Sequence, residues 1–286
     1  MRVAITGTTG RVGRALADRL AGDHEVIELP RQRLDMARPG CEGLLERLSF
    51  DVLLNPAGLT GLEQCEDDPV LARRVNALAP GALAWSCRKL GKPMLHFSTD
   101  YVFDGIEPGL RSEDDPTAPL STYGKTKAEG EHAVLAAGGA VMRVSWVFGP
   151  ERAAFPERIV SQALAGERLA AVADKFSLPA YTKDIASWVA AWLGAGCPAG
   201  VFHACNGGEP VSWHGMAREI SSFLATKGIE AGEVQELKMD EMKAFRAPRP
   251  RHTAMATRRL EALLGAPPRP WQEAMMEHLA SLLISR

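Results

Sequence analysis

Cysteine, net charge and long apolar runs are all scarce in this chain of 286 residues. The five cysteines, at positions 41, 65, 87, 197 and 205, are scattered and odd in number, and they form no Cys-x-x-Cys pair. This spacing excludes a disulfide framework and a cysteine-based zinc site, and it indicates free thiols in a reducing compartment. A net charge of -2 gives no support for a nucleic-acid partner.

One stretch is long enough and apolar enough to suggest a membrane span. Residues 186–205 contain no Asp, Glu, Lys or Arg, but glycines and Pro198 interrupt them in the middle. A helix over 184–193, a turn and a buried strand over 201–204 fit this pattern better. No targeting segment is visible, because the apolar N-terminus reads as the first strand itself. We expect a cytoplasmic protein with no membrane partner.

Strands and helices alternate along the chain. Apolar residues make up 46% and charged residues 24%, which is ordinary globular usage and excludes a disordered chain. The expected strands cover 2–6, 25–29, 51–55, 93–97, 140–145 and 201–204, and the expected helices start near 12 and cover 69–90, 123–137 and 184–193. This rhythm predicts an α/β fold, a Rossmann-type doubly wound parallel sheet with ligands at the carboxyl ends of its strands.

The pattern loosens after about residue 150, which predicts two domains. Residues 1–150 are expected to form an NAD(P)-binding Rossmann domain. Residues 151–286 are expected to form mainly a smaller C-terminal substrate-binding lobe, with part of 180–205 returning to the Rossmann sheet.

A glycine-rich turn follows the first strand at once. Gly7, Gly10 and Gly13 stand between a buried strand and a helical period, which is the context that a dinucleotide-binding turn needs. Gly7 allows the tight turn, Gly10 lets the backbone approach a pyrophosphate, and Gly13 lets helix and strand pack closely. The helix N-terminus then offers amides to the phosphates. The alternative is a glycine-rich turn without a ligand.

The end of the second strand bears on the choice of cofactor. An NAD-preferring site usually has an acid there for the ribose 2′-OH, whereas this chain has Pro30 followed by Arg31 and Arg33. Two guanidiniums suit a 2′-phosphate, so NADPH is the expected cofactor and NADH the alternative. The arginines could instead form a solvated loop, with Glu28 facing the ribose.

Tyr123 and Lys127 are the most informative pair of residues. Four positions apart on a helix, they share one face. An ammonium beside a phenol favours the phenolate, so we expect Lys127 to lower the pKa of Tyr123 and make it a proton donor. An amphipathic surface pair is the alternative interpretation.

Four blocks of sequence together resemble a known family. They are Gly-Thr-Thr-Gly-Arg-Val-Gly (7–13), Ser-Thr-Asp-Tyr-Val-Phe-Asp-Gly (98–105), Pro-Leu-Ser-Thr-Tyr-Gly-Lys-Thr-Lys-Ala-Glu-Gly-Glu (119–131) and Arg-Val-Ser-Trp-Val-Phe-Gly (143–149). The chain resembles the dTDP-4-dehydrorhamnose reductases, which are extended short-chain dehydrogenases/reductases. The resemblance covers nearly the whole chain.

The resemblance implies a role for particular residues. The catalytic set falls on Thr99, Tyr123 and Lys127. With the glycine turn and Arg31, which were identified from the residues themselves, the full cofactor set comprises Gly7, Thr9, Gly10, Arg11, Val12, Gly13, Arg31, Asp35, Met36, Ala57, Gly58, Leu59 and Thr60, together with Tyr123 and Lys127. The substrate set comprises Thr99, Asp100, Tyr101 and Trp146. No metal site is implied.

The implied reaction is NADPH-dependent reduction of the 4-keto group of a nucleotide-linked deoxysugar. The expected substrate is dTDP-4-dehydro-L-rhamnose, with Tyr123 as proton donor, Thr99 as donor to the same oxygen and Lys127 on the nicotinamide ribose. The rivals are a non-catalytic regulatory subunit resembling the methionine adenosyltransferase beta subunit, and a reductase or epimerase for another nucleotide sugar. A homodimer is left open.

The chain departs from the family in a loop near the sugar nucleotide. Family members usually carry Gln and Gly where this chain has Lys175 and Ser177, which opens the question of which sugar or base is bound. Outside the motifs, Arg246, Arg249 and Arg251 could clamp a diphosphate or form a basic surface loop. His96 is expected to be a satisfied core residue.

Overall fold

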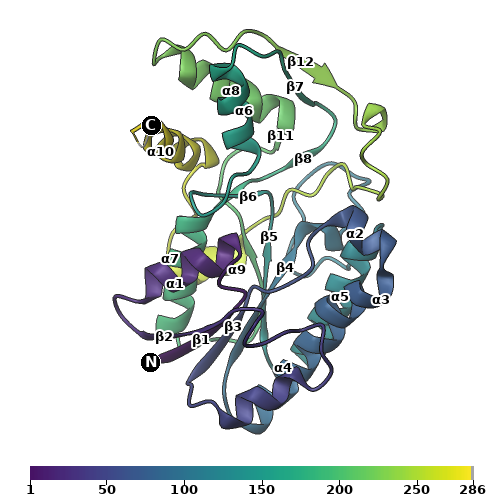
Figure 1. Cartoon of the computed structure of the whole chain (residues 1–286), viewed down its shortest axis with the longest axis vertical. Helices are drawn as coiled ribbons and strands as arrows, with labels where there is room; N and C mark the ends of the chain where they lie inside the picture. Colours follow the sequence, from purple (N-terminus) through teal and green to yellow (C-terminus); the bar gives the residue numbers. More distant parts are fainter. Residues whose placement is uncertain (285–286) are drawn as a thin grey trace.

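A computed structural model describes residues 1–284, and its centre is a six-stranded parallel sheet (Figure 1). The strands are β1 (Arg2–Thr6), β2 (Glu25–Leu29), β3 (Val52–Asn55), β4 (Met94–Thr99), β5 (Ala140–Val144) and β10 (Gly200–Ala204). Their spatial order is β10-β5-β4-β3-β1-β2. The chain thus moves outward in one direction from β1 to β2 and in the other from β3 to β10. The predicted doubly wound fold is confirmed, and the reversal between β1 and β3 opens a ligand crevice at the carboxyl ends of the strands.

Side chains of the sheet alternate between apolar cores on its two faces. In β1, Val3 and Ile5 join one core and Ala4 joins the other. Helices α1 (Arg11–Leu20), α7 (Thr182–Gly194) and α9 (Arg258–Leu264) cover the first face, and α4 (Ala79–Lys89) and α5 (Thr122–Ala136) cover the second (Figure 1). Burial on both faces explains why these strands read as continuous apolar runs.

The predicted helix over 69–90 is present as one continuous helical stretch, but its middle turn is π-helical, not α-helical. The structure has α3 (Pro69–Arg73), a π-helical turn η2 (Arg74–Leu78) and then α4. Pro80 has no N–H to donate to the carbonyl of Asn76, and its ring crowds that carbonyl, so the regular helical bond fails there. The Asn76 carbonyl instead lies against Gly130 of α5, where a side chain would not fit.

The start of this helical segment follows the expectation more closely. Asp68 caps α3 by accepting a hydrogen bond from the Leu71 amide at 2.9 Å. A short helix that the sequence did not suggest, α2 (Leu62–Asp67), precedes it. Both helices lie beside α5 at the carboxyl end of the sheet (Figure 1).

A second layer of structure stands above the carboxyl ends of the strands (Figure 1). Its larger elements are α6 (Phe155–Leu164), β7 (Leu169–Val172), α8 (Trp213–Ala225), β12 (Val234–Leu237) and α10 (Trp271–Ile284). Its smaller elements are β6 (Val147–Phe148), β8 (Phe176–Ser177), β9 (Ala180–Tyr181), β11 (Val211–Ser212) and η4 (Met239–Glu241), while η1 (Cys41–Arg47) and η3 (Asp100–Val102) belong to the sheet region. Because β10 pairs with β5, residues 200–204 lie in the central sheet. The functional division near residue 150 stays a prediction.

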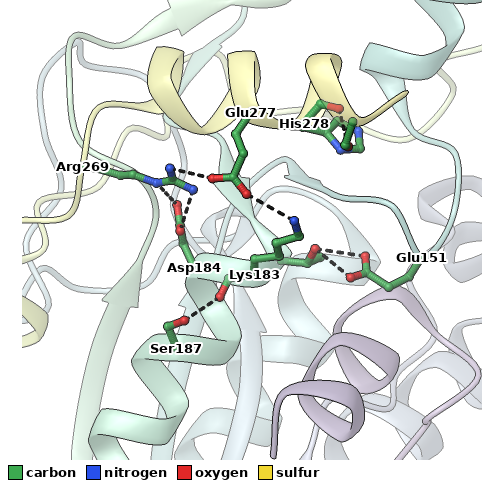
Figure 2. A network of polar contacts seen from close by, with 9 residues as sticks. Glu151, Lys183, Asp184, Ser187, Arg269, Glu277 and His278 are labelled. Carbon is green, nitrogen blue, oxygen red and sulfur yellow. Dashed lines mark hydrogen bonds and ion pairs between the residues drawn. The ribbon is translucent and has the colours of Figure 1, made fainter. Parts of the chain in front are cut away.

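A network of ion pairs joins α10 to α7 (Figure 2). Glu277 of α10 accepts from Lys183 of α7 at 3.2 Å and from Arg269 at 2.8 Å. Arg269 also binds Asp184 of α7 through two nitrogens, each at 2.9 Å. Planar two-point pairing of this kind fixes orientation as well as distance, so the network holds the C-terminal helix against the start of α7. Among the helices of residues 1–284, none has the length and apolarity needed to cross a membrane.

Candidate active site

The turn between β1 and α1 requires glycine at predicted positions. Gly7 has a φ of +58°, a left-handed value that side chains disfavour. A Cβ on Gly13 would collide with the Gly7 carbonyl, so only glycine lets α1 pack this close to β1. The Gly10 amide donates to the Gly7 carbonyl at 2.9 Å, and α1 begins directly after Gly10. The first amides of α1 therefore face the crevice as a site suited to an anion.

A cavity of about 900 Å³ runs over the carboxyl ends of the strands. Every residue that the sequence assigns to catalysis, cofactor or substrate lines it. From the N-terminal half these are Gly7, Thr9, Gly10, Arg11, Val12, Gly13, Arg31, Asp35, Met36, Ala57, Gly58, Leu59 and Thr60, and from the rest Thr99, Asp100, Tyr101, Tyr123, Lys127 and Trp146. The fold thus brings the whole predicted set together, while the role of each member in binding or catalysis stays a prediction.

The cavity is positively charged at the end next to β2. Of the two predicted arginines, Arg31 lines the cavity and pairs with Asp35 at 3.4 Å, and its guanidinium is largely exposed. Arg33 lies with Arg38 in an adjoining hollow and donates to the Glu28 carbonyl at 3.1 Å. Glu28, the alternative partner for a ribose, is instead bound by Arg14 through two hydrogen bonds of 3.2 Å. This end of the cavity suits a phosphate better than a neutral ribose hydroxyl.

Asn76, in the π-helical turn, was not identified from the sequence. Its side-chain amide accepts from the Leu59 amide at 2.8 Å and donates to the Leu59 carbonyl at 2.9 Å. This pair of bonds fixes the segment after β3, where Gly58 and Thr60 line the cavity. Asn76 is fully buried. Its signal is the π turn around it, a feature often found at functional sites, and this turn is visible only in the structure.

Helix α5 presents Tyr123 and Lys127 to the cavity from one face, as predicted. Ser121 caps the helix by accepting from the Gly124 amide at 3.2 Å. Gly124 itself has no room for a Cβ, because the Tyr101 carbonyl lies against it. The rings of Tyr101 and Tyr123 meet edge to face, with centroids 5.9 Å apart. Close packing of α5 on η3 therefore sets the position of the Tyr123 phenol.

The pKa of Tyr123 moves in the direction opposite to the prediction. Burial raises the pKa of the phenol above its ordinary value, and the nearby Asp100 adds to the rise, while a hydrogen bond with Thr99 opposes it. Lys127 is not among the groups that shift this pKa, because its ammonium is turned toward the sheet. Among residues 1–284, Tyr123 and Lys127 therefore each have their own partners and do not pair with each other as expected.

Those partners of Lys127 are His96 and the Phe97 carbonyl. The Lys127 Nζ lies 3.0 Å from His96 Nε2 and 2.5 Å from the carbonyl oxygen. Burial lowers the pKa of Lys127 to about 8, with Glu131 opposing the shift. His96 was expected to be a satisfied core residue, and it is fully buried and paired, but its contact with Lys127 was not foreseen.

His96 belongs to a chain of buried polar groups behind Lys127. The Thr6 hydroxyl accepts from the Ala57 amide and donates to Asn55 Oδ1 at 2.6 Å. The Asn55 amide nitrogen then faces His96 Nδ1 at 3.0 Å. Burial and the charge of Lys127 hold the pKa of His96 well below its usual value, so the ring is neutral. A neutral imidazole has one donor and one acceptor nitrogen, so the tautomer of His96 couples the Asn55 amide on one side to the proton on Lys127 Nζ on the other.

Asp100 is the centre of a cluster of hydroxyl groups. Its Oδ2 accepts from Ser145 at 3.0 Å, from Ser177 at 3.3 Å and from Thr253 at 2.5 Å. Its Oδ1 accepts from Thr99 at 3.1 Å. Three of these donors come from segments far apart in the sequence, and Ser145 and Thr253 were not singled out before. Asp100 was predicted to contact substrate, yet its carboxylate is largely committed to the protein.

Trp146 has the strained backbone that functional residues often show. Its φ is +41°, in the left-handed region. Its indole packs on Trp213, with ring centroids 5.3 Å apart, and its Nε1 is buried without a hydrogen-bond partner in the described chain. Nearby, the Arg11 guanidinium donates to three carbonyls, those of Val147, Arg152 and Ala153. Arg11 thereby holds the loop after Trp146 over the cavity.

The three arginines near residue 250 are not arranged as a diphosphate clamp. Arg246 pairs with Asp67 and Arg249 with Glu63, at 2.9 and 2.7 Å. Arg251 pairs with Asp174 and Asp240. None of the three lines the cavity. In the part of the chain that the structure describes, no group of three His, Cys, Asp or Glu residues is placed to hold a metal ion.

Comparisons with known proteins agree over the whole length. The family model described as RmlD substrate binding domain matches residues 1–284. A dTDP-4-dehydrorhamnose reductase from Burkholderia thailandensis is 33% identical, over 96% of this chain and 97% of its own. A probable dTDP-4,6-dihydroxy-2-methyloxan-3-one 4-ketoreductase from Streptomyces antibioticus is 34% identical, over 99% and 96%. The crystal structure of a dTDP-4-dehydrorhamnose reductase from Clostridium acetobutylicum has a TM-score of 0.91 at 29% identity, covering 99% and 100%.

Proposed function

The chain belongs to the RmlD substrate binding domain family, and from this membership we propose that it is an NADPH-dependent oxidoreductase. It reduces the 4-keto group of a nucleotide-linked deoxysugar, with dTDP-4-dehydro-L-rhamnose as the substrate and dTDP-L-rhamnose as the product. The observation that carries the proposal is the single cavity that the glycine turn shares with Thr99, Tyr123 and Lys127. That the chain forms a homodimer also stays a prediction.

The residues around the glycine turn fit a phosphorylated dinucleotide. Gly10 and Gly13 line the cavity without side chains, and the first amides of α1 face it. Arg31, which lines the cavity, would hold the 2′-phosphate, which favours NADPH over NADH. The Asn76-fixed segment at Gly58 and Thr60 would lie along the nicotinamide half. The reducing equivalents come as a hydride from the bound cofactor.

Tyr123 donates the proton that the reduced oxygen needs. Because burial raises its pKa, the phenol carries its proton at neutral pH, as a donor must. As charge develops on the oxygen, Thr99 donates a second hydrogen bond to it, since its hydroxyl already lies within reach of the phenol. When no substrate is bound, the Thr99 hydroxyl donates to the Asp100 carboxylate, so Asp100 orients this hydroxyl. Lys127, with a pKa of about 8, can hold the ribose and take part in returning a proton to Tyr123.

The test follows NADPH oxidation with dTDP-4-dehydro-L-rhamnose generated in situ, for the wild type and Tyr123→Phe. We expect rapid oxidation by the wild type and a loss of about a hundredfold or more in kcat in the variant, with NADPH affinity kept. Tyr181→Phe is the matched control, because Tyr181 lies outside the cavity. Full activity of Tyr123→Phe would remove Tyr123 from the chemistry.

A second candidate is reduction of a different dTDP-linked keto-sugar, which the Streptomyces ketoreductase at 34% identity favours. Turnover with such a sugar, and none with the rhamnose precursor, would select it. Tight NADPH binding with no turnover of either sugar would instead support a regulatory subunit, and tightly retained NAD would support an epimerase.

A further inference from the structure

Lys175 is a fully buried lysine behind the substrate half of the cavity. Its side chain has no exposed surface, and its Nζ donates to the Pro250 carbonyl at 2.7 Å. That carbonyl is its one hydrogen-bond acceptor among residues 1–284. Burying an ammonium with so little hydrogen bonding is costly, so other groups must compensate for the loss of water.

Two aromatic rings and one carboxylate provide that compensation. The ammonium lies 4.6 Å from the centroid of the Tyr101 ring and 5.8 Å from that of Trp146. At these distances a cation is attracted by the ring faces, most strongly where water is excluded. The charge of Asp100 also stabilises the protonated form of Lys175. The buried cation is therefore bound chiefly by residues of the cavity wall.

The rings stand between Lys175 and the cavity. Tyr101, Trp146 and Asp100 line the cavity, whereas Lys175 does not. A ligand in this half would contact the rings on one side while the ammonium attracts them from behind. The contact of the Lys175 ammonium with the Trp146 ring also helps to hold Trp146 in place. The positive φ of Trp146 is disfavoured and must be maintained by its contacts.

On the basis of the proposed function, we propose that Lys175 is a positioning residue that determines specificity at the sugar-nucleotide end of the cavity. Its ammonium fixes the planes of Tyr101 and Trp146 as one aromatic wall and places a positive charge behind that wall. The wall then recognises a nucleotide sugar through ring contacts, with the charge favouring its anionic diphosphate.

Ser177, two residues after Lys175, contacts Asp100 beside this wall. Its hydroxyl lies 2.6 Å from that of Ser145 and donates to the Asp100 carboxylate. The backbone between them is fixed in turn, since the Phe176 amide donates to the Arg251 carbonyl. Lys175, directly before β8, and Ser177, within β8, thus both act on Asp100.

The experiment compares Lys175→Met and Lys175→Gln with the wild type. Methionine keeps the length and removes the charge, and glutamine also keeps a donor for the Pro250 carbonyl. We expect both variants to raise the KM for dTDP-4-dehydro-L-rhamnose about tenfold. The KM for NADPH should stay within about twofold, because the glycine turn lies at the other end of the cavity. Lys227→Met is the matched control: its ammonium also lies over a ring, 5.5 Å from the Phe223 centroid, but it is exposed.

Three outcomes would overturn the proposal. An unchanged KM for the sugar in both variants would do so, as would an equal rise in both KM values, which indicates a general structural role. Wild-type behaviour of Lys175→Gln would show that the charge is not needed. If Lys175→Met fails to fold, the glutamine variant decides.

A second readout separates this proposal from the reaction itself. If the wild type turns over no sugar, the wild type and Lys175→Gln are titrated with dTDP by calorimetry. Binding that is about tenfold weaker in the variant supports the wall while the proposed reaction fails. Equal affinities, or no binding by the wild type, overturn the role of Lys175.

Discussion

The two ends of the cavity are built in different ways. The cofactor end is made largely of backbone, from short continuous segments at the ends of β1 and β3, with Gly7 and Gly13 at its closest contacts. The sugar end is made of buried side chains that meet from distant segments, with Asp100 bound by Ser145, Ser177 and Thr253. A site made of backbone depends on the absence of side chains, whereas a site made of side chains depends on the charge and partners of each residue.

Gly13→Ala should give the largest effect, and only at the cofactor end. The new Cβ collides with the Gly7 carbonyl, so α1 must move away from the turn. We expect NADPH affinity to fall about a hundredfold in a fluorescence titration. Gly22→Ala is the matched control, because nothing lies within 4 Å of a Cβ there. Affinity within about threefold of the wild type for Gly13→Ala would contradict the backbone description.

The sugar end should reveal its buried charge in the pH dependence of stability. Burial lowers the pKa of Lys175 from 10.5 to about 8. Between these values the unfolded chain holds the proton and the folded chain does not, so raising the pH stabilises the fold. From pH 8 to pH 10, the unfolding free energy of the wild type should rise by about 2 kcal/mol relative to Lys175→Met.

Urea denaturation of both proteins at each pH measures that difference. The buried cysteines change the unfolding free energy in the opposite direction, but they do so equally in both proteins. Their effect therefore cancels in the difference. Burial raises the pKa of Cys65 to about 11 and that of Cys87 to about 12, so alkaline pH destabilises the fold through them. A difference that does not change with pH would mean that Lys175 is not a buried cation.

His96→Leu should affect the chemistry without affecting the sugar end of the cavity. It removes the contact between Nε2 and Lys127 Nζ at 3.0 Å and leaves the aromatic wall intact. We expect kcat to fall about tenfold, with the KM for the sugar unchanged and an altered alkaline limb in the pH–rate profile. His96→Gln, which can still hydrogen-bond, should recover part of the loss. Equal effects of both substitutions would point to packing alone.

Arg31→Ala should give the smallest effect, confined to one phosphate. Its guanidinium is largely exposed, 3.4 Å from Asp35, so solvent weakens any ion pair it forms. We expect the KM for NADPH to rise about fivefold and the KM for NADH to stay the same. Arg19→Ala, which removes another exposed arginine and its surface pair with Asp23, serves as the control. Equal changes for both cofactors would argue against a 2′-phosphate site.

The sequence was informative wherever a local pattern has a single structural solution. The alternation of strands and helices predicted the doubly wound sheet, and the spacing of Tyr123 and Lys127 placed both on one face of α5. The sequence was misleading where residues far apart in the chain together determine the state of one group. The pKa of Tyr123 rises because burial and Asp100 outweigh other influences, and the π turn exists because Pro80 frees a carbonyl that Gly130 can receive.

What the sequence determined by itself is the cofactor end. Glycine spacing, strand periodicity and the position of α1 are encoded over a few consecutive residues, since backbone conformation is a local property. Only the tertiary structure decided the sugar end. The burial of Lys175 behind Tyr101 and Trp146, the hydroxyls around Asp100 and the contact of His96 with Lys127 join segments far apart in the chain, and burial and charge pairing arise only when those segments are packed together.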